Sequence, residues 1–352
     1  MRYRVAIVGA TGAVGRELLR VLEERDFPVQ SVRLLASERS AGQRLAFRGE
    51  PIPVEVLRPD SFTGIEIAFF SAGSARSREF APCAVRAGAV VIDNSAAFRM
   101  NPQTPLVIPE INPDALAQHA GIIANPNCST IIMLMALEPL RRLTRIRRII
   151  VSTYQAASGA GAQAMQELLD ATRAYLEGKP FEPKALPHPY AFNLFSHNSP
   201  IGDDGYNEEE RKMILETRKI WGDPAIAVSP TCIRVPVLRA HSESIVVELE
   251  TRPALDAIYA AYRAFEGVEL VDDRAHNHFP MPLEATGRDA VLVGRIRYDA
   301  GLPNGVALFA CGDQLRKGAA LNAVQIAERL VQAGATETER GDRPPPQGTI
   351  AP

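Results

Sequence analysis

The order strand, glycine turn, helix at the start of the chain constrains its fold more than any other feature. Residues 4–8 (R-V-A-I-V) are a β-branched run typical of a buried strand, residues 9–15 (G-A-T-G-A-V-G) follow, and an amphipathic stretch begins at Glu17. Glycines in such a turn let the backbone approach a pyrophosphate closely, and the N–H groups of the next helix bind its charge. The spacing G-x-x-G-x-x-G departs from the G-x-G-x-x-G fingerprint, so a tight turn without a ligand is the alternative interpretation.

The segment after the next predicted strand indicates which dinucleotide would bind. The strand-like run 31–35 leads into Ser37, Glu38, Arg39 and Ser40. An NAD site usually presents a carboxylate to the ribose hydroxyls here, whereas the 2′-phosphate of NADP requires a cation and hydroxyls. Ser37, Arg39 and Ser40 suit the phosphate, while Glu38 is the competing signal. The sequence therefore favours NADP over NAD, and a solvated basic loop is the plain alternative.

The remaining pattern predicts an α/β chain of two domains. Up to residue 127, short β-rich runs alternate with helical stretches, which is typical of a parallel, doubly wound, Rossmann-like sheet. Residues 128–311 predict an α+β catalytic and dimerisation domain with a mostly antiparallel sheet. Its expected strands are 146–154, 225–237, 244–250 and 291–298, and its expected helices are 162–177 and 207–220, joined by a Pro/His/Asn-rich loop over 179–205.

The end of the chain is predicted to return to the first domain. Residues 312–330 are Ala-rich and predict a helix that packs on residues 1–127 and completes that domain. Residues 335–352 are too polar and proline-rich to pack, and a disordered tail is expected there.

Composition limits the possible partners. At 352 residues, 46% of them hydrophobic, and with a net charge of −2, the chain gives no reason to expect nucleic acid or an anionic membrane surface. No apolar run approaches about 18 residues, and the N-terminus enters a strand at once, so neither a spanning helix nor a signal peptide is expected. Four cysteines without C-x-x-C spacing argue against a disulfide framework and against a metal site. We therefore expect a cytoplasmic enzyme whose thiols stay reduced.

One cysteine lies in a position that can make it a nucleophile. Cys128 follows the turn Asn-Pro-Asn and begins the apolar run 131–137, which predicts a helix in whose capping Ser129 or Thr130 takes part. The unpaired N–H groups and the positive end of the helix dipole favour the thiolate, which is the reactive form. The alternative is a buried cysteine acting as a small hydrophobe. That alternative fits the three other cysteines, Cys83, Cys232 and Cys311.

Two polar residues of the second domain are candidate partners of this thiol. Arg234 lies in a strand-like run, and His241 follows at the turn into the next run. If the two strands pair as a hairpin, both side chains reach the same end of the sheet. An arginine in an apolar strand needs an anion, which either a protein carboxylate or a substrate carboxylate provides. A histidine at a turn most simply has a structural role. Beside an activated cysteine, it is instead a candidate general acid and base.

Nine ordered motifs, which span nearly the whole chain, resemble those of the aspartate-β-semialdehyde dehydrogenases. They are residues 9–15, 37–43 (S-E-R-S-A-G-Q), 70–73 (F-S-A-G), 93–99 (D-N-S-A-A-F-R), 125–130 (N-P-N-C-S-T), 154–159 (Y-Q-A-A-S-G), 233–237 (I-R-V-P-V), 241–243 (H-S-E) and 315–320 (L-R-K-G-A-A). The resemblance implies an NADPH-dependent enzyme that makes aspartate 4-semialdehyde from 4-aspartyl phosphate, on the route to lysine, methionine, threonine and isoleucine. It also implies a homodimer or homotetramer.

The same resemblance implies a role for individual residues. Cys128 is the acylated nucleophile, Gln155 orients the acyl group, and His241 handles the proton. Arg234 binds the substrate carboxylate, and Glu209 binds the amino group, with Glu208 and Glu210 left open as alternatives. The implied phosphate site is Lys212, Arg99 and Asn127, and the implied nucleotide site is Gly9, Thr11, Gly12, Ala13, Val14, Arg39, Ser40, Ser158, Gly159 and Gln314.

Two other interpretations stay open. N-acetylglutamyl-phosphate reductase and glyceraldehyde-3-phosphate dehydrogenase share the Rossmann domain, the cysteine, the histidine and the acyl-phosphate chemistry. A substrate with a free amino group explains an acidic residue beside Lys212 better than either of them does. An inactive relative that only binds nucleotide is the third possibility, and the joint presence of Cys128, Gln155, Arg234 and His241 argues against it.

Overall fold

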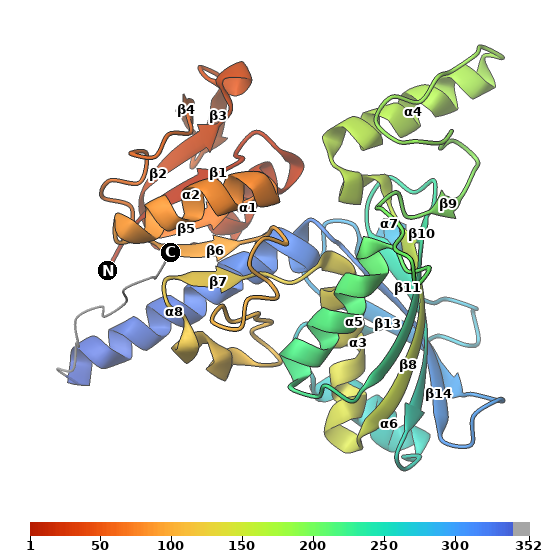
Figure 1. Ribbon diagram of the computed structural model, residues 1–352. Coiled ribbons are helices and arrows are strands. Elements are labelled where there is room, and N and C mark those ends of the chain that lie inside the picture. The colour runs from red at the N-terminus through yellow and green to blue at the C-terminus, as the bar shows by residue number, and fades with distance from the viewer. Residues whose placement is uncertain (341–352) are drawn as a thin grey trace. The chain divides into compact units, whose positions relative to one another are not determined.

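The computed structural model describes residues 1–340 and forms two compact units, each built on its own sheet (Figure 1). The first unit comprises residues 1–125 and the C-terminal segment from Ala320, and the second comprises Pro126–Ala319. Both units mix helices and strands, so the α/β fold class expected from the sequence is confirmed.

The first unit has a largely parallel sheet whose strand order, within the described residues, is β3-β4-β2-β1-β5-β6-β7. All pairs are parallel except β3 with β4. The strands are β1 (Tyr3–Val8), β2 (Val29–Ala36), β3 (Arg44–Phe47), β4 (Glu50–Val56), β5 (Ile67–Phe70), β6 (Val90–Asp93) and β7 (Ile122–Ala124). Because β1 lies between β2 and β5, the strand order reverses at the end of β1, where a doubly wound sheet binds its ligand.

Helices cover both faces of this sheet. Val5 and Ile7 point to the face covered by α1 (Ala13–Glu24) and α8 (Leu321–Arg340), whereas Ala6 and Val8 point to the face of α2 (Ser74–Arg86). Burial on both faces explains why β1 is a continuous apolar run and does not alternate.

The second unit has a mostly antiparallel sheet with the order β12-β13-β14-β11-β8-β10-β9 in the described residues. Only β12 with β13 and β8 with β10 run parallel among its described pairs. The strands are β8 (Ile146–Gln155), β9 (Phe195–Ser196), β10 (Ala227–Arg234), β11 (His241–Leu249), β12 (Val268–Leu270), β13 (Val291–Tyr298) and β14 (Gly305–Gly312).

Two helices of the second unit, α3 (Cys128–Leu143) and α5 (Glu208–Trp221), pack on one face of this sheet (Figure 1). Gly312 lets α3 approach, since a Cβ there would lie 2.8 Å from the Ile132 side chain. The unit also contains α4 (Ala162–Leu176), α6 (Leu255–Ala264) and α7 (Pro282–Ala285). On the opposite face, Ile150 and Tyr154 are exposed.

The hairpin expected between the strands of Arg234 and His241 is wrong, because β8 lies between β10 and β11. Parallel pairing places Arg234 beside Gln155, the last residue of β8, and antiparallel pairing places Ser242 beside Tyr154. The ends of β8 and β10 and the start of β11 therefore meet at one edge of the sheet. The two side chains still converge, through a topology that alternation within each strand does not reveal.

The C-terminal helix also differs from the expectation of residues 312–330. Gly312 ends strand β14, a π-helical turn follows at Arg316–Ala320, and α8 begins only at Leu321. Because α8 continues to Arg340, residues 335–340 of the expected tail are helical, and residues 341–352 lie outside the described residues. No helix in the described part of the chain is long and apolar enough to cross a membrane.

The close packing of α1 on the glycine turn gives a stability prediction. A Cβ at Gly15 would lie 2.3 Å from the Gly9 carbonyl oxygen and 2.7 Å from Ala10 Cα, so Gly15→Ala must push α1 away from the turn. We expect a loss of about 1–3 kcal/mol of unfolding free energy and weaker nucleotide binding, measured by thermal melting and by nucleotide titration. Gly301→Ala is the matched control, since its Cβ would meet only the Asp299 Oδ1 at 3.4 Å. Equal melting temperatures for the two variants would contradict the packing argument.

Candidate active site

Asn127 organises the start of α3, where Cys128 is the first helical residue. Its side-chain oxygen accepts hydrogen bonds from the backbone N–H groups of Ser129 at 3.0 Å and Thr130 at 3.2 Å. The capping side chain is therefore that of Asn127, and Ser129 and Thr130 contribute their backbone donors, which corrects the capping expected from the sequence. The cap holds the thiol beside the positive end of the helix.

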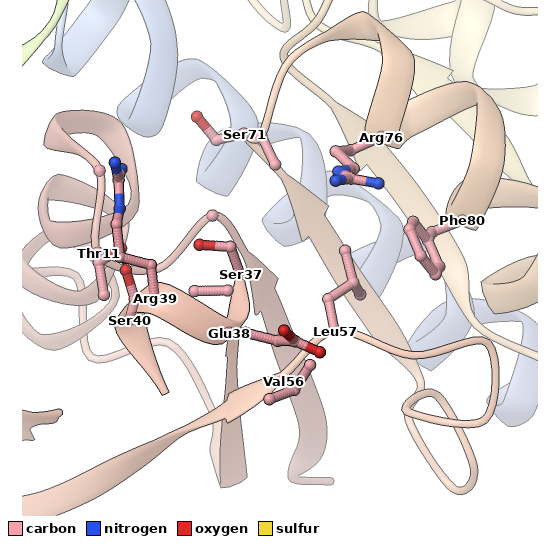
Figure 2. Close-up of a pocket in the computed structure, with 14 residues that line it drawn as sticks. Thr11, Ser37, Glu38, Arg39, Ser40, Val56, Leu57, Ser71, Arg76 and Phe80 are labelled. Atoms are coloured by element: carbon pink, nitrogen blue, oxygen red, sulfur yellow. The ribbon is translucent and has the colours of Figure 1, made fainter. Parts of the chain in front are cut away.

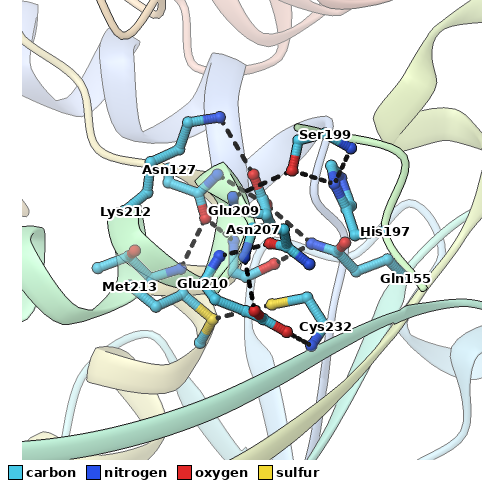
Figure 3. A network of polar contacts seen from close by, with 12 residues as sticks. Asn127, Gln155, His197, Ser199, Asn207, Glu209, Glu210, Lys212, Met213 and Cys232 are labelled. Carbon is cyan, nitrogen blue, oxygen red and sulfur yellow. Dashed lines mark hydrogen bonds and ion pairs between the residues drawn. The ribbon is translucent and has the colours of Figure 1, made fainter. Parts of the chain in front are cut away.

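The same asparagine links α3 to α5, and Gln155 joins β8 to both helices. Its side-chain N–H donates to Glu209 Oε1 at 2.9 Å, and its backbone N–H donates to Glu216 Oε2 at 2.7 Å. Gln155 Nε2 also donates to Glu209 Oε1 at 2.9 Å and to the Ser129 hydroxyl. Figure 3 shows Asn127, Gln155 and Lys212 converging on Glu209. Residues far apart in sequence thus share one buried polar network.

Of the three consecutive glutamates, Glu209 is the one whose carboxylate joins the network around Asn127. Only 4% of Glu209 is exposed, whereas Glu208 is exposed and Glu210 closes the capping box of Asn207. Burial by itself would raise the pKa of Glu209, but His197, Lys212 and the two amide hydrogen bonds outweigh it and hold the pKa well below its usual range. Glu209 is therefore an anion, and its Oε2 lies 3.3 Å from Lys212 Nζ.

Arg234 is a buried cation whose hydrogen-bond partners among the described residues are neutral. Its Nε donates to Asn198 Oδ1 at 3.2 Å, one terminal nitrogen donates to the Ala156 carbonyl oxygen at 3.1 Å, and the other lies 2.9 Å from His197 Nε2. Since buried charges are normally balanced, a guanidinium held by neutral groups is suited to bind an anion from outside the protein.

His241 is fully buried at the start of β11. Its Nδ1 accepts a hydrogen bond from the Ala156 backbone N–H at 3.0 Å, so the neutral ring carries its proton on Nε2. Burial, followed by the charge of Arg234, lowers the pKa of His241 to about 3. A Cβ at Gly159 would lie 2.9 Å from this Nε2 and 3.1 Å from Arg234, so the glycine keeps space beside both side chains.

Gly318 likewise keeps space beside Cys128, the candidate nucleophile. A Cβ at this position of the π-helical turn would lie 2.9 Å from Cys128 Cβ. Cys128 is half-buried, while Cys232 and Cys311 are buried within strands, in agreement with the hydrophobic interpretation of those two. Cys83 lies half-buried in α2.

A further acid, Glu243, lies two residues after His241 on β11 and is fully buried. Within the described part of the chain, neither of its carboxyl oxygens has a hydrogen-bond partner. Burial, reinforced by the charge of Glu209, raises the pKa of Glu243 well above its ordinary value. Glu243 is therefore a neutral acid near the ionised Glu209.

The first unit contains a pocket of about 550 Å³ at the end of β1. Figure 2 shows Thr11, Arg39 and Ser40 on one side of it, and Leu57, Arg76 and Phe80 on the other. Gly9, Gly12 and Ser37 also line it, whereas Ala13 and Val14 are the first residues of α1. A Cβ at Gly9 would lie 2.4 Å from the Ser71 carbonyl oxygen, which excludes any larger residue at the turn. Glycine turn, helix start and basic side chain together fit a phosphorylated nucleotide.

The other expected site residues are placed as follows. Arg99, in the first unit, donates to the Asn125 carbonyl oxygen at 2.9 Å and to the Asn94 carbonyl oxygen at 2.7 Å. Ser158, in the second unit, accepts a hydrogen bond from Gln314 Nε2. Among the described residues, no group of three His, Cys, Asp or Glu side chains could hold a metal ion.

Sequence reasoning missed His197 and Ser199, which lie in the loop expected only as Pro/His/Asn-rich. It also missed Leu57, Arg76 and Phe80 in the pocket. The one available signal was the polar triplet His-Asn-Ser at 197–199, between the short strand β9 and the capped start of α5.

Comparisons with known proteins agree on one family. Residues 4–119 match the model of the semialdehyde dehydrogenase NAD-binding domain, and residues 137–317 match that of the semialdehyde dehydrogenase dimerisation domain. The chain is 55% identical over 331 residues to an aspartate-semialdehyde dehydrogenase of Synechocystis, covering 94% of this chain and 98% of the relative. It is 51% identical to that of Aquifex aeolicus, covering 95% and 99%.

A solved structure gives the same result. The crystal structure of aspartate semialdehyde dehydrogenase II of Vibrio cholerae complexed with ASA matches with a TM-score of 0.92 and 45% identity, over 94% of this chain and 99% of that chain.

The burial of Glu243 predicts a pH-dependent stability. Because its pKa is raised in the folded protein, the unfolded chain releases the proton first as the pH rises, and stability is lost from about the unfolded pKa of 4.5 up to the folded pKa. Glu243→Gln keeps the size and shape of the side chain but removes its ionisable proton. The unfolding free energy of this variant should therefore exceed that of the wild type by on the order of 1 kcal/mol or more at neutral pH. Urea unfolding at several pH values measures this.

The difference should vanish below about pH 4, where both side chains are neutral. Glu266→Gln, at an exposed position of the same unit, is the control and should show no such trend. If the wild-type and Glu243→Gln stabilities stay parallel at all pH values, Glu243 is not held neutral by the fold.

Proposed function

Because the chain belongs to the aspartate-semialdehyde dehydrogenase family, we propose that it converts 4-aspartyl phosphate to aspartate 4-semialdehyde and phosphate, with NADPH as the reductant. It is an oxidoreductase of amino-acid biosynthesis. The observation that carries the chemical proposal is the position of Cys128 at the Asn127-capped start of α3, in the same unit as a buried anion, Glu209, and a buried cation, Arg234. A reducing compartment such as the cytoplasm suits this free thiol.

The two buried charges match the two ends of an α-amino acid. Glu209 is ionised and suits the substrate ammonium group, and Arg234 offers a planar guanidinium that suits the α-carboxylate. An N-acetylated substrate has no ammonium group for Glu209 to balance. This pairing favours 4-aspartyl phosphate over N-acetylglutamyl phosphate and over glyceraldehyde 3-phosphate.

The first chemical step is acyl transfer to sulfur. The Cys128 thiolate attacks the acyl carbon, the carbon–oxygen bond to the phosphate breaks, and an aspartyl thioester remains on the enzyme. The cationic side chains of Lys212 and Arg99 are suited to bind the phosphate group of the substrate and to stabilise its charge as it leaves. Asn127 is the third residue of this proposed phosphate site. Gln155, held by Ser129 and Glu209, orients the acyl group.

The second step reduces the thioester. When bound, the nicotinamide nucleotide supplies the hydride for this reduction. His241 presents its Nε2–H into the space left by Gly159, where it can donate a hydrogen bond to the oxygen that becomes negative. Return of the sulfur to the thiolate then frees the aldehyde.

The pocket of the first unit supports NADP as the preferred nucleotide. Ser37, Arg39 and Ser40 offer two hydroxyl groups and a cation to a 2′-phosphate. Thr11 donates to the Ser40 hydroxyl at 3.2 Å, which holds Ser40 beside the glycine turn. Ala13 and Val14 start the helix there, and Ser158, Gly159 and Gln314 are proposed contacts from the second unit. Glu38 also lines the pocket and is the residue that favours NAD.

A homodimer is the proposed assembly, with a homotetramer as a further possibility. The dimerisation-domain match spans the second unit, whose sheet leaves Ile150 and Tyr154 exposed on the face opposite α3. A self-complementary apolar sheet face is the kind of surface that a second copy covers.

The nucleophile is tested by Cys128→Ala. We expect no turnover with aspartate semialdehyde, phosphate and NADP, because no other group on α3 can form the thioester, while NADP binding should persist because the glycine turn is elsewhere. Cys128→Ser should be almost as inactive, since a hydroxyl is far less acidic than a thiol. Cys83→Ala, at another half-buried cysteine, is the matched control and should keep wild-type activity. Turnover above trace level in Cys128→Ala would remove Cys128 from the mechanism.

The cofactor preference is tested by Arg39→Ala. The change deletes a charge-assisted contact worth about 1.5–3 kcal/mol to a phosphate that NAD lacks. NADP(H) binding should therefore weaken at least tenfold, while NAD(H) binding changes little, as measured by fluorescence titration. Arg58→Ala, at an arginine of the same unit outside the pocket lining, serves as the control. Equal losses for both nucleotides would show that Arg39 has a structural role only.

A further inference from the structure

We propose that His197 is a positioning residue that sets Arg234 and Glu209 at a fixed spacing, and thereby fits the site to a carboxylate and an ammonium group on one carbon. The proposal rests on the function proposed above. His197 lies in the loop between β9 and α5, and the family resemblance of the sequence implied no role for it.

A short chain of hydrogen bonds runs from one substrate-binding charge to the other through His197. Arg234 lies 2.9 Å from His197 Nε2, and His197 Nδ1 lies 3.1 Å from the Ser199 hydroxyl. The Ser199 hydroxyl in turn accepts the backbone N–H of Glu209 at 3.2 Å. Figure 3 shows His197, Ser199 and Glu209 in this order.

The donors fix the tautomer of His197. A guanidinium group only donates hydrogen bonds, so Nε2 must accept from Arg234 and the ring proton must lie on Nδ1. Nδ1–H then donates to the Ser199 hydroxyl, which also accepts from Glu209 N–H. The Ser199 backbone N–H lies 3.2 Å from the same Nδ1, but it can donate to that nitrogen only in the other tautomer, in which Nε2–H would face the guanidinium donors. A neutral imidazole is the form that can link an arginine on one side to a hydroxyl acceptor on the other.

The surroundings of His197 keep it in that neutral form. Burial lowers its pKa to about 4; the negative charge of Glu209 opposes the shift, and the positive charges of Arg234 and Lys212 add to it. A doubly protonated ring would place a donor against the donors of Arg234 and break the link.

The loop itself is fixed to the strand that carries Arg234. His197 N–H donates to the Cys232 carbonyl oxygen at 2.9 Å, and Phe195 of β9 pairs with Arg234 of β10. Asn198, the next residue, accepts from Arg234 Nε. Three consecutive residues, 197–199, therefore hold the guanidinium and the start of α5 together. Loss of the His197 ring should loosen the orientation of Arg234 without removing any charge.

Steady-state kinetics of three variants test the proposal. His197→Ala deletes the link, His197→Gln offers a carbonyl oxygen that can accept from Arg234, and His276→Ala is the control at an exposed histidine of the same unit. The oxidative direction is assayed, with aspartate semialdehyde and phosphate varied in turn.

His197→Ala should raise the KM for aspartate semialdehyde about tenfold to a hundredfold, with the KM for phosphate and the kcat changed far less. His197→Gln should recover most of the loss, and His276→Ala should match the wild type. Equal increases in both KM values, no increase, or a Gln variant no better than the Ala variant would overturn the proposal. Absence of turnover in the wild type would instead refute the proposed function.

A measurement on the wild-type protein covers the case in which a variant fails to fold. NMR titration of the histidine Cε1–H signals should give His197 a pKa far below the ordinary value of about 6.5. An ordinary pKa for His197 would contradict the neutral link.

Discussion

The hydrogen bonds of Asn127 are the contacts on which the rest of the site depends. Its side-chain oxygen caps α3, its side-chain nitrogen binds Glu209, and its backbone nitrogen binds Glu216. One residue therefore fixes where the helix that begins with Cys128 starts, and joins it to α5, which carries the buried anion. Replacement of a capping Asn by Ala typically costs about 1 kcal/mol, and here it would also release a buried carboxylate from one of its donors.

Of the titratable side chains in the second unit near Asn127, some are charged and others are neutral. Glu209 is ionised, and Arg234 and Lys212 are its cationic neighbours in the network. His197, His241 and Glu243, which are also buried there, are held neutral by burial and by those charges. Burial and neighbouring partners together decide which of these groups carry charge, and the neutral His197 and His241 serve as hydrogen-bonding links.

Much of this arrangement could be predicted from the sequence, because local signals encode it. The runs predicted as strands over 146–154 and 291–298 and as helices over 162–177 and 207–220 differ from β8, β13, α4 and α5 by a residue or two at most. The Asn-Pro-Asn turn before Cys128 also marks the true start of α3.

The errors arose where the structure depends on contacts distant in sequence. Alternation shows which residues of β10 and β11 face the core, but it does not show that β8 pairs between them. Residues 316–320 (R-K-G-A-A) are as helix-like in composition as the start of α8, and the π-helical turn that they form brings Gly318 against Cys128. His197 acts through Arg234 and Ser199, and no periodic pattern in a loop reveals such a link.

The central claim is that the Asn127-capped start of α3 is the site of acyl transfer. The most direct test mixes the enzyme with aspartate semialdehyde and NADP in the absence of phosphate, quenches with acid, and locates the acyl group by peptide mass spectrometry. We predict an aspartyl thioester on the peptide that contains Cys128, which disappears when phosphate is added before the quench. An aspartyl group on another residue, or NADPH formed in a burst with no acylated peptide, would contradict the account.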